Sequence, residues 1–588
     1  MPNAPSKRYH SSAGNGCALI VCDSRREEHL QIHETVYAAL GHFGIPYRVH
    51  DLAAADLDAA TLEACAVTIL GQDNMGPGLT ATSQSALLDA VSGGLGMVNL
   101  DYNLMQYDRS LINATGLAAV RAGRPMAVGS TASVGIPAAD HWITWTQEAG
   151  RVHQLNMPVP AALAKVKGRE TQILAETDIG GPAVVSTRLG KGRIVQWLLS
   201  HRIWTLQAFG HAHGLDDIFW KGIVWAARKP FAMLCIPPFV RFRFDDCNGL
   251  YRTPKDMAFV DEFARRGHKP NMCVSMNALT DDGWRFLKKH YDAGTAEVAP
   301  HTWEGGVSLY YGKDGKAYSK KQFNKLIRET ASMMRRQKIV PSKILSDHEH
   351  EYSSNVLPYL KQLGIEYKMN VMLPDEKWAG IHTDWKPAPY GSMSYALDYT
   401  PGPYPLFVVF NHYPAFDHAR SYLSPTRFLL NRAGGYGAHM WDFLNGLTTR
   451  DLPKNDVKTM ADRLVDHTRL GLNSLFFGGS ISHSHFSCAL SKADWKAVLD
   501  RYEKCTERLE KINVGYDDVA IYARSKFHTR VTVSTRLADG AMTVRLAGKA
   551  DVPLKLSVFD EKGDAPERRY IDGVPFDGRF EFQVSARP

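Results

Sequence analysis

The sequence predicts an α/β protein of three domains, and three observations support this prediction. The chain has 588 residues, more than one hydrophobic core holds at about 100–200 residues per domain. Strand-like and helix-like segments alternate in two runs, at 15–229 and 230–515. The last segment, 516–588, lacks helical periodicity and alternates apolar with polar residues, which is typical of a small β-sandwich.

The first run predicts a parallel, doubly wound sheet. Apolar segments such as GCALIVC and LGMVNLD are typical of buried strands, and helical patterns such as TSQSALLDAVSGG separate them. Between Pro125 and Leu199 the pattern changes to short strands, with a hairpin turn at Gly190-Lys191-Gly192. We expect the helix in DDIFWKGIVWAARKP to end at Pro230, because proline cannot continue a helix.

The second run predicts a distorted (β/α) barrel. Polar residues collect where the strands of MLCIPPFVRFRFDDC, AEVAPHTW and KILSDHEH end, and barrel enzymes hold their reactive groups at that end of the strands. The stretch from about Pro374 to Arg420 is rich in proline, glycine and aromatic residues, without a clear helix. Such a long loop is expected to form a lid or a binding wall.

Composition and charge narrow the classes of function. The chain is 44% hydrophobic and 22% charged, as soluble globular proteins are. Its net charge of +8 comes without a dense Lys/Arg block between aromatic residues, so we expect no nucleic-acid partner. The polar N-terminus and the lack of a long apolar run predict a cytoplasmic protein without a membrane partner, unless a leader has been trimmed. The eight cysteines form no CxxC pair, which favours reduced thiols.

Two adjacent carboxylates, Asp245 and Asp246, end an apolar strand of the second run. Neighbouring residues on a regular strand point to opposite faces, but a chain that turns at the strand end lets both line one cavity. Such a pair can divide its work, because one carboxylate binds a cation while the other accepts a proton. Taken alone, the pair also fits a helix cap or a polar loop.

His301 ends a later strand of the same run, in the segment PHTWE. Neutral imidazole is a good ligand for zinc and similar ions. A lone histidine is more often a hydrogen-bonded core residue, but this one is expected at the same end of the barrel as the aspartates. The sequence therefore predicts that the aspartate pair and His301 meet at one site that can hold a metal ion.

The segments RFDD and HTWEG resemble, in order and spacing, two motifs of the NodB-type polysaccharide deacetylases. The resemblance implies a distorted (β/α)7 barrel for residues 230–515. It also implies that Asp245 is the general base, that Asp246 is a metal ligand and that His301 is the first histidine ligand.

The sequence departs from that family at two places. The second histidine of the HTW motif falls on Gly305, and the third motif, which contains Arg-Pro, is missing. In its place stands the segment SDHEHEY. A histidine of this segment can supply the lost ligand, and because His348 and His350 share one face of a strand, both stay open.

A late strand, LFFGGSISHSH, ends in two further histidines. The deacetylases carry a general acid at this place, and both His483 and His485 resemble it, with His483 preferred. A third metal ligand or a surface pair is the alternative. Trp441 and Asp442, in GAHMWDF, resemble the family's fourth motif, whose aspartate orients the catalytic base.

Several further residues are expected to contact the substrate. Aromatic rings offer apolar faces on which sugar rings stack, although core packing explains many of them. The predicted substrate contacts are Arg243, Trp303, Glu304, Tyr352 and Trp441.

Residues 15–229 resemble the class I glutamine-amidotransferase-like domains that accompany carbohydrate enzymes, through GGLGMVNLD, HWIT and PAVVSTRLGKGRIVQW. Working amidotransferases place a nucleophilic cysteine on a turn after a strand. Here YNLMQYD follows GMVNLD and contains no cysteine. We therefore expect a non-catalytic domain that serves packing, cleft shape or assembly into a homo-oligomer.

Together these features predict a hydrolase that uses a divalent metal, zinc by preference, to remove N- or O-linked acetyl groups from an oligo- or polysaccharide. One alternative is a glycoside hydrolase in which Asp245 or Asp246 pairs with Glu304 or Glu349. The other is a carbohydrate-binding protein without catalysis, because the second histidine of the motif is lost.

Overall fold

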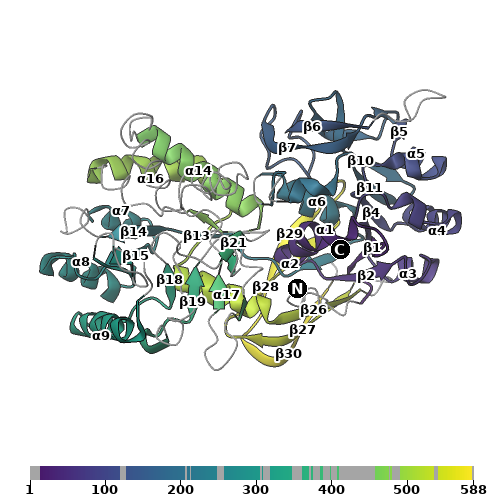
Figure 1. The fold of residues 1–588 in the computed structure, drawn as a ribbon. Helices are drawn as coiled ribbons and strands as arrows, with labels where there is room; N and C mark the ends of the chain where they lie inside the picture. Colours follow the sequence, from purple (N-terminus) through teal and green to yellow (C-terminus); the bar gives the residue numbers. More distant parts are fainter. Residues whose placement is uncertain are drawn as a thin grey trace. The chain divides into compact units, whose positions relative to one another are not determined.

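The computed structural model describes most of the chain (Figure 1). The described residues are 14–118, 128–205, 208–211, 214–247, 257–304, 307–308, 318–346, 361–369, 372–374, 385–387, 397–398, 407–409, 457–475, 477–479, 491–535 and 541–585. They belong to a mixed α/β protein and form two compact units. Unit 1 contains 1–236, 473–475 and 525–588, and unit 2 contains 237–472 and 476–524.

Unit 1 contains a nine-stranded sheet of order β2-β1-β3-β4-β11-β10-β9-β6-β7. The first five strands run parallel and the rest pair antiparallel. The strands are β1 (Ala18–Cys22), β2 (Tyr47–Asp51), β3 (Val67–Leu70), β4 (Gly96–Asn99), β6 (Val128–Gly135), β7 (Val152–Ala162), β9 (Gln172–Thr177), β10 (Gly181–Leu189) and β11 (Gly192–Trp197). Leu189 pairs with Gly192, which confirms the predicted hairpin.

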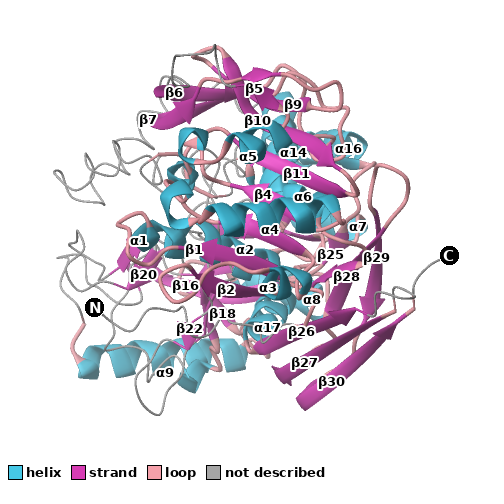
Figure 2. Cartoon of the chain, turned by 90° about the vertical axis from the view of Figure 1, so that its right-hand side faces the viewer, coloured by secondary structure: helices cyan, strands magenta, loops and turns pink. Residues whose placement is uncertain are grey.

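Helices cover both faces of the parallel part of this sheet, and the burial pattern of β11 shows why. Ile194 belongs to the apolar cluster that also contains Leu87 and Val91 of α4 (Ala81–Ser92). The next residue, Val195, faces Gly222 of α6 (Asp216–Ala226). Because successive strand residues point to opposite faces, α4 and α6 lie on opposite sides of the sheet. Figure 2 shows the helices of unit 1 around these strands.

The remaining α- and π-helices of unit 1 are short. They are α1 (His29–Ile32), the π-helix η2 (His33–Tyr37), α2 (Ala38–Phe43), α3 (Ala59–Glu63) and α5 (Arg109–Ala114).

The strands after residue 528 belong to unit 1 and fall into two small antiparallel sheets. One has the order β26-β27-β30, and the other has the order β12-β28-β29. These strands are β12 (Phe231–Met233), β26 (Thr529–Thr535), β27 (Met542–Ala550), β28 (Lys555–Asp560), β29 (Glu567–Asp572) and β30 (Phe576–Val584). A strand that precedes the central segment, β12, thus completes a sheet of the C-terminal segment.

Unit 2 contains short parallel strands that alternate with helices. Its three larger sheets have the orders β24-β13-β25, β14-β15-β16-β17 and β18-β19-β23-β22, and β20 (Met372–Pro374) pairs with β21 (Trp385–Pro387) in a two-stranded sheet. The strands are β13 (Phe239–Arg241), β14 (Arg243–Cys247), β15 (Asn271–Ser275), β16 (Glu297–Glu304), β17 (Val307–Ser308), β18 (Ile344–Ser346), β19 (Tyr367–Met369), β22 (Leu397–Asp398), β23 (Phe407–Val409), β24 (Gly478–Gly479) and β25 (Ile512–Asn513). Within the described residues these sheets do not close into a barrel.

Three helices of unit 2, α8, α9 and α16, begin at capping residues that the sequence supplies. Ser319 and Gln322 form a capping box at α9, and Ser491 and Asp494 form one at α16. Thr280 accepts a hydrogen bond from the amide of Gly283 at the start of α8. The helices are α7 (Phe259–Arg265), α8 (Asp281–Asp292), α9 (Lys320–Arg336), α14 (Val457–Asn473), α16 (Lys492–Thr506) and α17 (Tyr516–Phe527).

The prediction that no helix follows residue 515 is wrong, because helix α17 begins at Tyr516. Its first turn is fixed by a residue far away in sequence, because Glu297 accepts hydrogen bonds from the amides of Tyr516 and Asp517 at 2.8 and 3.3 Å. These amides have no partner inside the helix, and a carboxylate there also interacts favourably with the positive end of the helix dipole. The start of this helix therefore depends on a tertiary contact.

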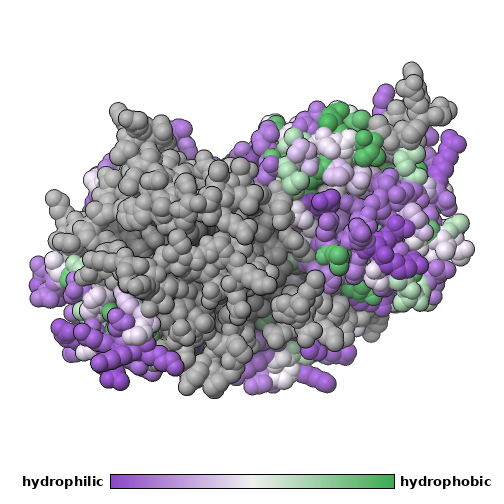
Figure 3. Space-filling view, viewed as in Figure 1, coloured by the Kyte–Doolittle hydropathy of each residue, from purple (hydrophilic) through white to green (hydrophobic). Residues whose placement is uncertain are grey.

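The surface of the described residues shows two features relevant to partners. None of the helices in these residues is long and apolar enough to cross a bilayer. Apolar side chains gather over β6 and β7 (Figure 3), where Val128, Val152 and Met157 are exposed. Exposed apolar patches often mark contact surfaces, but the homo-oligomer stays a prediction.

Candidate functional site

The sheet β14-β15-β16 has one apolar face and one polar face. Phe244, Met272, Val274 and Val298 belong to an apolar cluster that also contains residues of α7, α8 and α16. The alternate residues are polar and buried. They are Arg243, Asn271, Ser275 and Glu297, which are all at most 5% exposed. Since strand residues alternate between faces, the polar residues line the face away from these helices.

The parallel register of β14 and β15 shifts at the aspartate pair. Phe244 pairs with Met272 and Cys247 pairs with Val274, so Asp245 and Asp246 together oppose Cys273 alone. Two residues facing one is the signature of a β-bulge, which bends a strand and turns side chains from their regular direction. The strict alternation that would place the two aspartates on opposite faces is therefore broken at this point of the backbone.

A second register shift lies at His301. Val274 pairs with Pro300 and Ser275 pairs with Thr302, so His301 is the extra residue of β16. Its side chain is buried, with 3% exposed. Bulges are over-represented beside active sites. Both strands that carry predicted ligands thus leave regular pairing at those ligands, at the same end of one parallel sheet.

Hydrogen bonds hold β16 in place beside His301. The Ser275 and Thr302 hydroxyls are hydrogen-bonded to each other, and both side chains are fully buried. Beyond β15, the amide of Met276 donates to the carbonyl of Thr302 at 2.9 Å, and that of Asn277 donates to the carbonyl of Trp303 at 2.7 Å. The residues that follow His301 are therefore fixed on the loop after β15.

The amino-terminal end of the polar face is filled by a satisfied network. The Asn271 amide donates to Glu297 at 3.0 Å and to the Ser342 hydroxyl at 3.1 Å, and the latter donates to Asp517 at 2.7 Å. Burial and the nearby Asp517 carboxylate raise the pKa of Glu297 to about 7. This end has its polar groups paired among themselves, as expected for a stabilising end of a β/α fold.

A buried arginine on the preceding strand β13 contacts two aromatic rings. The guanidinium carbon of Arg241 lies 3.9 Å from the ring centre of Phe477 and 4.3 Å from that of Tyr516. Arginine stacks well on aromatic faces and stays charged. Arg241 on β13 and Arg243 on β14 are thus two buried cations that precede the aspartate pair in sequence.

The late strand β24 runs parallel to β13, with Arg241 opposite Gly479. Gly479 has φ +84°, and a Cβ atom there would stand 2.1 Å from the carbonyl oxygen of Arg241. Only glycine fits this close approach. In sequence, Asp245 follows Arg241 by four residues and His483 follows Gly479 by four.

The predicted site residues differ in what the structure shows of them. Asp245, Asp246 and Glu304 have a described backbone but no described side chain, whereas the side chain of Trp303 packs half-buried against the apolar cluster. His348, His350, Tyr352, Trp441, His483 and His485 lie outside the described residues. Among the described side chains, no three His, Cys, Asp or Glu residues gather to hold a metal ion.

Sequence reasoning missed several buried polar residues of β13, β15 and β16. Arg241, Asn271, Ser275 and Glu297 are buried with Arg243 and His301. The signal was present in the strands themselves, because RFRFD, NMCVS and EVAPH place polar residues at every second or fourth position. That pattern predicts a buried strand with one polar face.

Comparisons with known proteins give only distant likenesses. No family model and no curated protein matches the chain. Among solved structures, the cytoplasmic protein STM1381 from Salmonella typhimurium LT2 is 12% identical, with a TM-score of 0.25 over 31% of this chain and 87% of that chain. The family 4 carbohydrate esterase from Streptomyces lividans is 14% identical, with a TM-score of 0.19 over 24% of this chain and 67% of that chain.

A glycosidase also appears among the solved structures. The exo-β-1,4-mannosidase Op5Man5 from Opitutaceae bacterium strain TAV5 is 12% identical, with a TM-score of 0.22 over 32% of this chain and 31% of that chain. At these TM-scores none of the three likenesses assigns a function to the site.

Proposed function

We propose that unit 2 is a metal-dependent hydrolase that removes N- or O-linked acetyl groups from a carbohydrate. The observation that supports this most directly is the pair of register shifts. They fall on Asp245-Asp246 and on His301, at the same end of one parallel sheet. Regular pairing is given up at the residues that the sequence motifs mark for chemistry, while the opposite end of the face is internally paired.

The chemistry of these residues fits a divalent cation. Asp246 offers a carboxylate and His301 a buried imidazole, a donor pair that zinc accepts, and His348 or His350 is the third ligand. A zinc ion held there lowers the pKa of a water molecule and polarises an acetyl carbonyl.

The chain's own residues then perform the proton transfers. Asp245 accepts the proton of the attacking water, and His483 donates a proton to the departing amine or alkoxide, with His485 as the alternative donor. Arg243, Trp303, Glu304, Tyr352 and Trp441 contact the sugar in this proposal.

The finer architecture belongs to the same proposal. Residues 15–229 form an amidotransferase-like domain without catalysis, and 230–515 form a distorted deacetylase barrel. Residues 516–588 form an accessory domain, in which the two small sheets make a β-sandwich. The alternating parallel strands of unit 2 support the barrel, and the order of the five parallel strands supports the doubly wound domain.

Acetate release tests the function. Zinc-loaded full-length chain is incubated with N-acetylated chitooligosaccharides and with O-acetylated xylan, and bound zinc is measured by mass spectrometry. We expect Asp246→Ala to lose both zinc and acetate release, and Asp245→Asn to keep zinc but lose turnover at least 100-fold. Asp282→Ala, at an exposed acid of α8, is the matched control and is expected to match the wild type.

Two results would overturn the proposal. One is an Asp246→Ala variant that keeps both zinc and acetate release. The other is release of free sugars without acetate and without metal, which indicates a glycoside hydrolase.

A further inference from the structure

Four of the five parallel strands of unit 1 are followed by buried polar residues, at one edge of the sheet. Asp23 follows β1, Asp73 follows β3, Asp101 follows β4, and Ser200 and His201 follow β11, and all are at most 3% exposed. In the order β2-β1-β3-β4-β11 the chain reverses direction between β1 and β3. In open α/β sheets, ligands bind beyond the carboxyl ends of the strands at such a reversal.

The carboxylates of Asp73 and Asp101 at this edge differ in how many of their oxygens accept hydrogen bonds. Asp101 accepts hydrogen bonds from the amide of Met75 at 2.7 Å and from the hydroxyl of Tyr107 at 2.8 Å. Asp73 accepts one from the Ser200 hydroxyl on Oδ2, while its Oδ1 is buried without a partner in the described structure. An unpaired buried carboxylate oxygen is costly, so something outside the described side chains is expected to pair with it.

His201 offers a second acceptor. The hydroxyl of Thr35 donates its single proton to the carbonyl of Gln31 at 2.9 Å, so it must accept from Nδ1 of His201, also at 2.9 Å. Burial lowers the pKa of His201 to about 4, which leaves the ring neutral with its proton on Nδ1. Nε2 is therefore a lone-pair acceptor, and it too is buried without a partner in the described structure.

Gln106 offers a further hydrogen-bond acceptor. Gln106 donates its Nε2 to Asn74 at 3.1 Å and keeps its Oε1 buried without a described partner. The unpaired indole N–H groups of Trp197 and Trp204 belong instead to the aromatic cluster around Phe219 of α6. Thr35 lies on the π-helix η2, a distortion that is frequent at functional sites.

A bound cation would offset the burial of the carboxylates at this edge. Burial raises the pKa of Asp73 to about 7 and that of Asp101 to about 6, and the Asp73 carboxylate raises the latter further. Asp23 is already paired with Arg25 at 2.7 Å. No three metal-binding side chains gather among the described residues, so the donor set favours an organic cation over a metal ion.

We propose that the carboxyl edge of the parallel strands in unit 1 binds a small organic ammonium compound, with Asp73 as its anionic contact. The ammonium group donates to Oδ1 of Asp73 and to Nε2 of His201, and a hydroxyl of the same compound donates to Oε1 of Gln106. An ammonium ion has three donors and no acceptor, which matches a site of unpaired acceptors.

Calorimetric titration with a matched pair of sugars tests this proposal. Glucosamine carries the ammonium group, and N-acetylglucosamine carries the same ring without the charge. We expect the wild-type chain to bind glucosamine at least tenfold more tightly than N-acetylglucosamine. Because unit 2 is also proposed to bind sugars, Asp246→Ala is titrated in parallel and is expected to bind glucosamine in unit 1 as the wild type does.

Variants of unit 1 locate the site. Asp73→Asn keeps an oxygen for the Ser200 hydroxyl but loses the charge, and we expect glucosamine to bind at least tenfold more weakly. Asp178→Asn is the control, because Asp178 accepts from Thr131 at 2.7 Å elsewhere in the unit. Glucosamine binding that survives Asp73→Asn, equal binding of both sugars, or no binding at all each refutes the proposal. The comparison of the two sugars on the wild type stands even where the variant fails to fold.

Discussion

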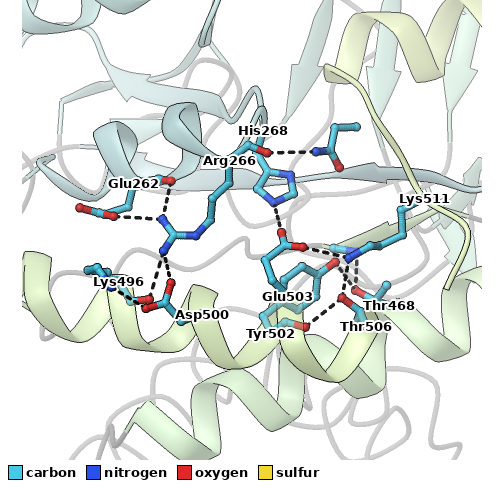
Figure 4. Close-up of polar contacts among 12 residues, drawn as sticks. Glu262, Arg266, His268, Thr468, Lys496, Asp500, Tyr502, Glu503, Thr506 and Lys511 are labelled. Carbon is cyan, nitrogen blue, oxygen red and sulfur yellow. Dashed lines mark hydrogen bonds and ion pairs between the residues drawn. The ribbon is translucent and has the colours of Figure 1, made fainter. Parts of the chain in front are cut away.

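Nε2 of His268 lies 2.9 Å from Oε1 of Glu503 on α16. His268 belongs to the loop that leads into β15. The other oxygen of Glu503 accepts from Lys511 at 3.1 Å (Figure 4). The imidazole also packs against the rings of Phe242 and Phe263, with centres 4.7 and 6.0 Å away. The side chain of Glu503, which contacts both His268 and Lys511, thus links α16 to the sheet that carries the candidate site.

Replacing Glu503 with glutamine is expected to destabilise unit 2 by about 1 kcal/mol at pH 7, a value reduced for its partial exposure. The hydrogen bond from His268, and next the contact with Lys511, lower the pKa of Glu503 from 4.5 to about 2. A lowered pKa stabilises the fold above pH 4.5, and this stabilisation is lost as the pH falls towards 2. Urea unfolding at several pH values measures it.

The control for this measurement is Glu510→Gln, at an exposed acid beyond the end of α16. Its unfolding midpoint should follow the wild type at every pH. A difference between Glu503→Gln and the wild type that stays constant down to pH 2 contradicts the assigned ion pair.

Glu297 predicts the opposite dependence on pH. Because burial and Asp517 raise its pKa to about 7, the folded chain holds a proton there that the unfolded chain releases near pH 4.5. The contribution to stability is therefore present below pH 4.5 and is lost as the pH rises through 7. We expect Glu297→Gln, which cannot ionise, to flatten the decline of unfolding free energy between pH 5 and 8. If the unfolding free energies of the variant and the wild type fall in parallel over this pH range, the assignment is wrong. Glu329→Gln on α9 is the control.

The sequence predicts strands and their ends better than it predicts their pairing. The aspartate pair and His301 end strands as expected, because apolar runs and polar endings are local features. The register shifts are not visible in the sequence, since a bulge depends on how many residues the partner strand places opposite it. No local pattern in RFDD states that Cys273 alone faces both aspartates.

The sequence does not predict helix α17, for a related reason. Its residues Tyr516, Val519 and Tyr522 are aromatic or β-branched, and such residues favour strands as much as helices. The contacts that decide are tertiary, because Glu297 caps the first turn and Tyr516 stacks on Arg241. Contacts between segments more than 200 residues apart leave no mark in local periodicity.

Gly479→Ala is expected to destabilise unit 2 by at least about 2 kcal/mol and to reduce acetate release. The alanine Cβ would collide with the carbonyl oxygen of Arg241, in addition to the strain of φ +84°. Gly294→Ala is a matched control, because Gly294 has φ +69° but nothing within 4 Å of its Cβ position. The control isolates the backbone strain, at about 1 kcal/mol. Equal losses in the two variants, measured by urea unfolding, contradict the close contact of β24 with β13.

The hydroxyl of Thr302 is hydrogen-bonded to that of Ser275, beside the extra residue His301. Thr302→Val keeps the branched shape and removes the hydroxyl, which leaves a buried Ser275 hydroxyl without this partner. We expect a loss of about 1 kcal/mol in stability. If His301 binds zinc, a bond that fixes its neighbour also fixes the ligand, and zinc affinity should fall by about tenfold.

Thr330→Val on α9 is the matched control, because the hydroxyl of Thr330 is buried without a partner among the described residues. Removing that hydroxyl should leave zinc affinity unchanged and stability equal or slightly higher, since burying an unpaired polar group is unfavourable. Competition with a chromophoric chelator measures the zinc affinity of both variants. Should Thr302→Val bind zinc as tightly as Thr330→Val, the hydroxyl pair does not position His301. Its role would then be confined to joining β15 and β16.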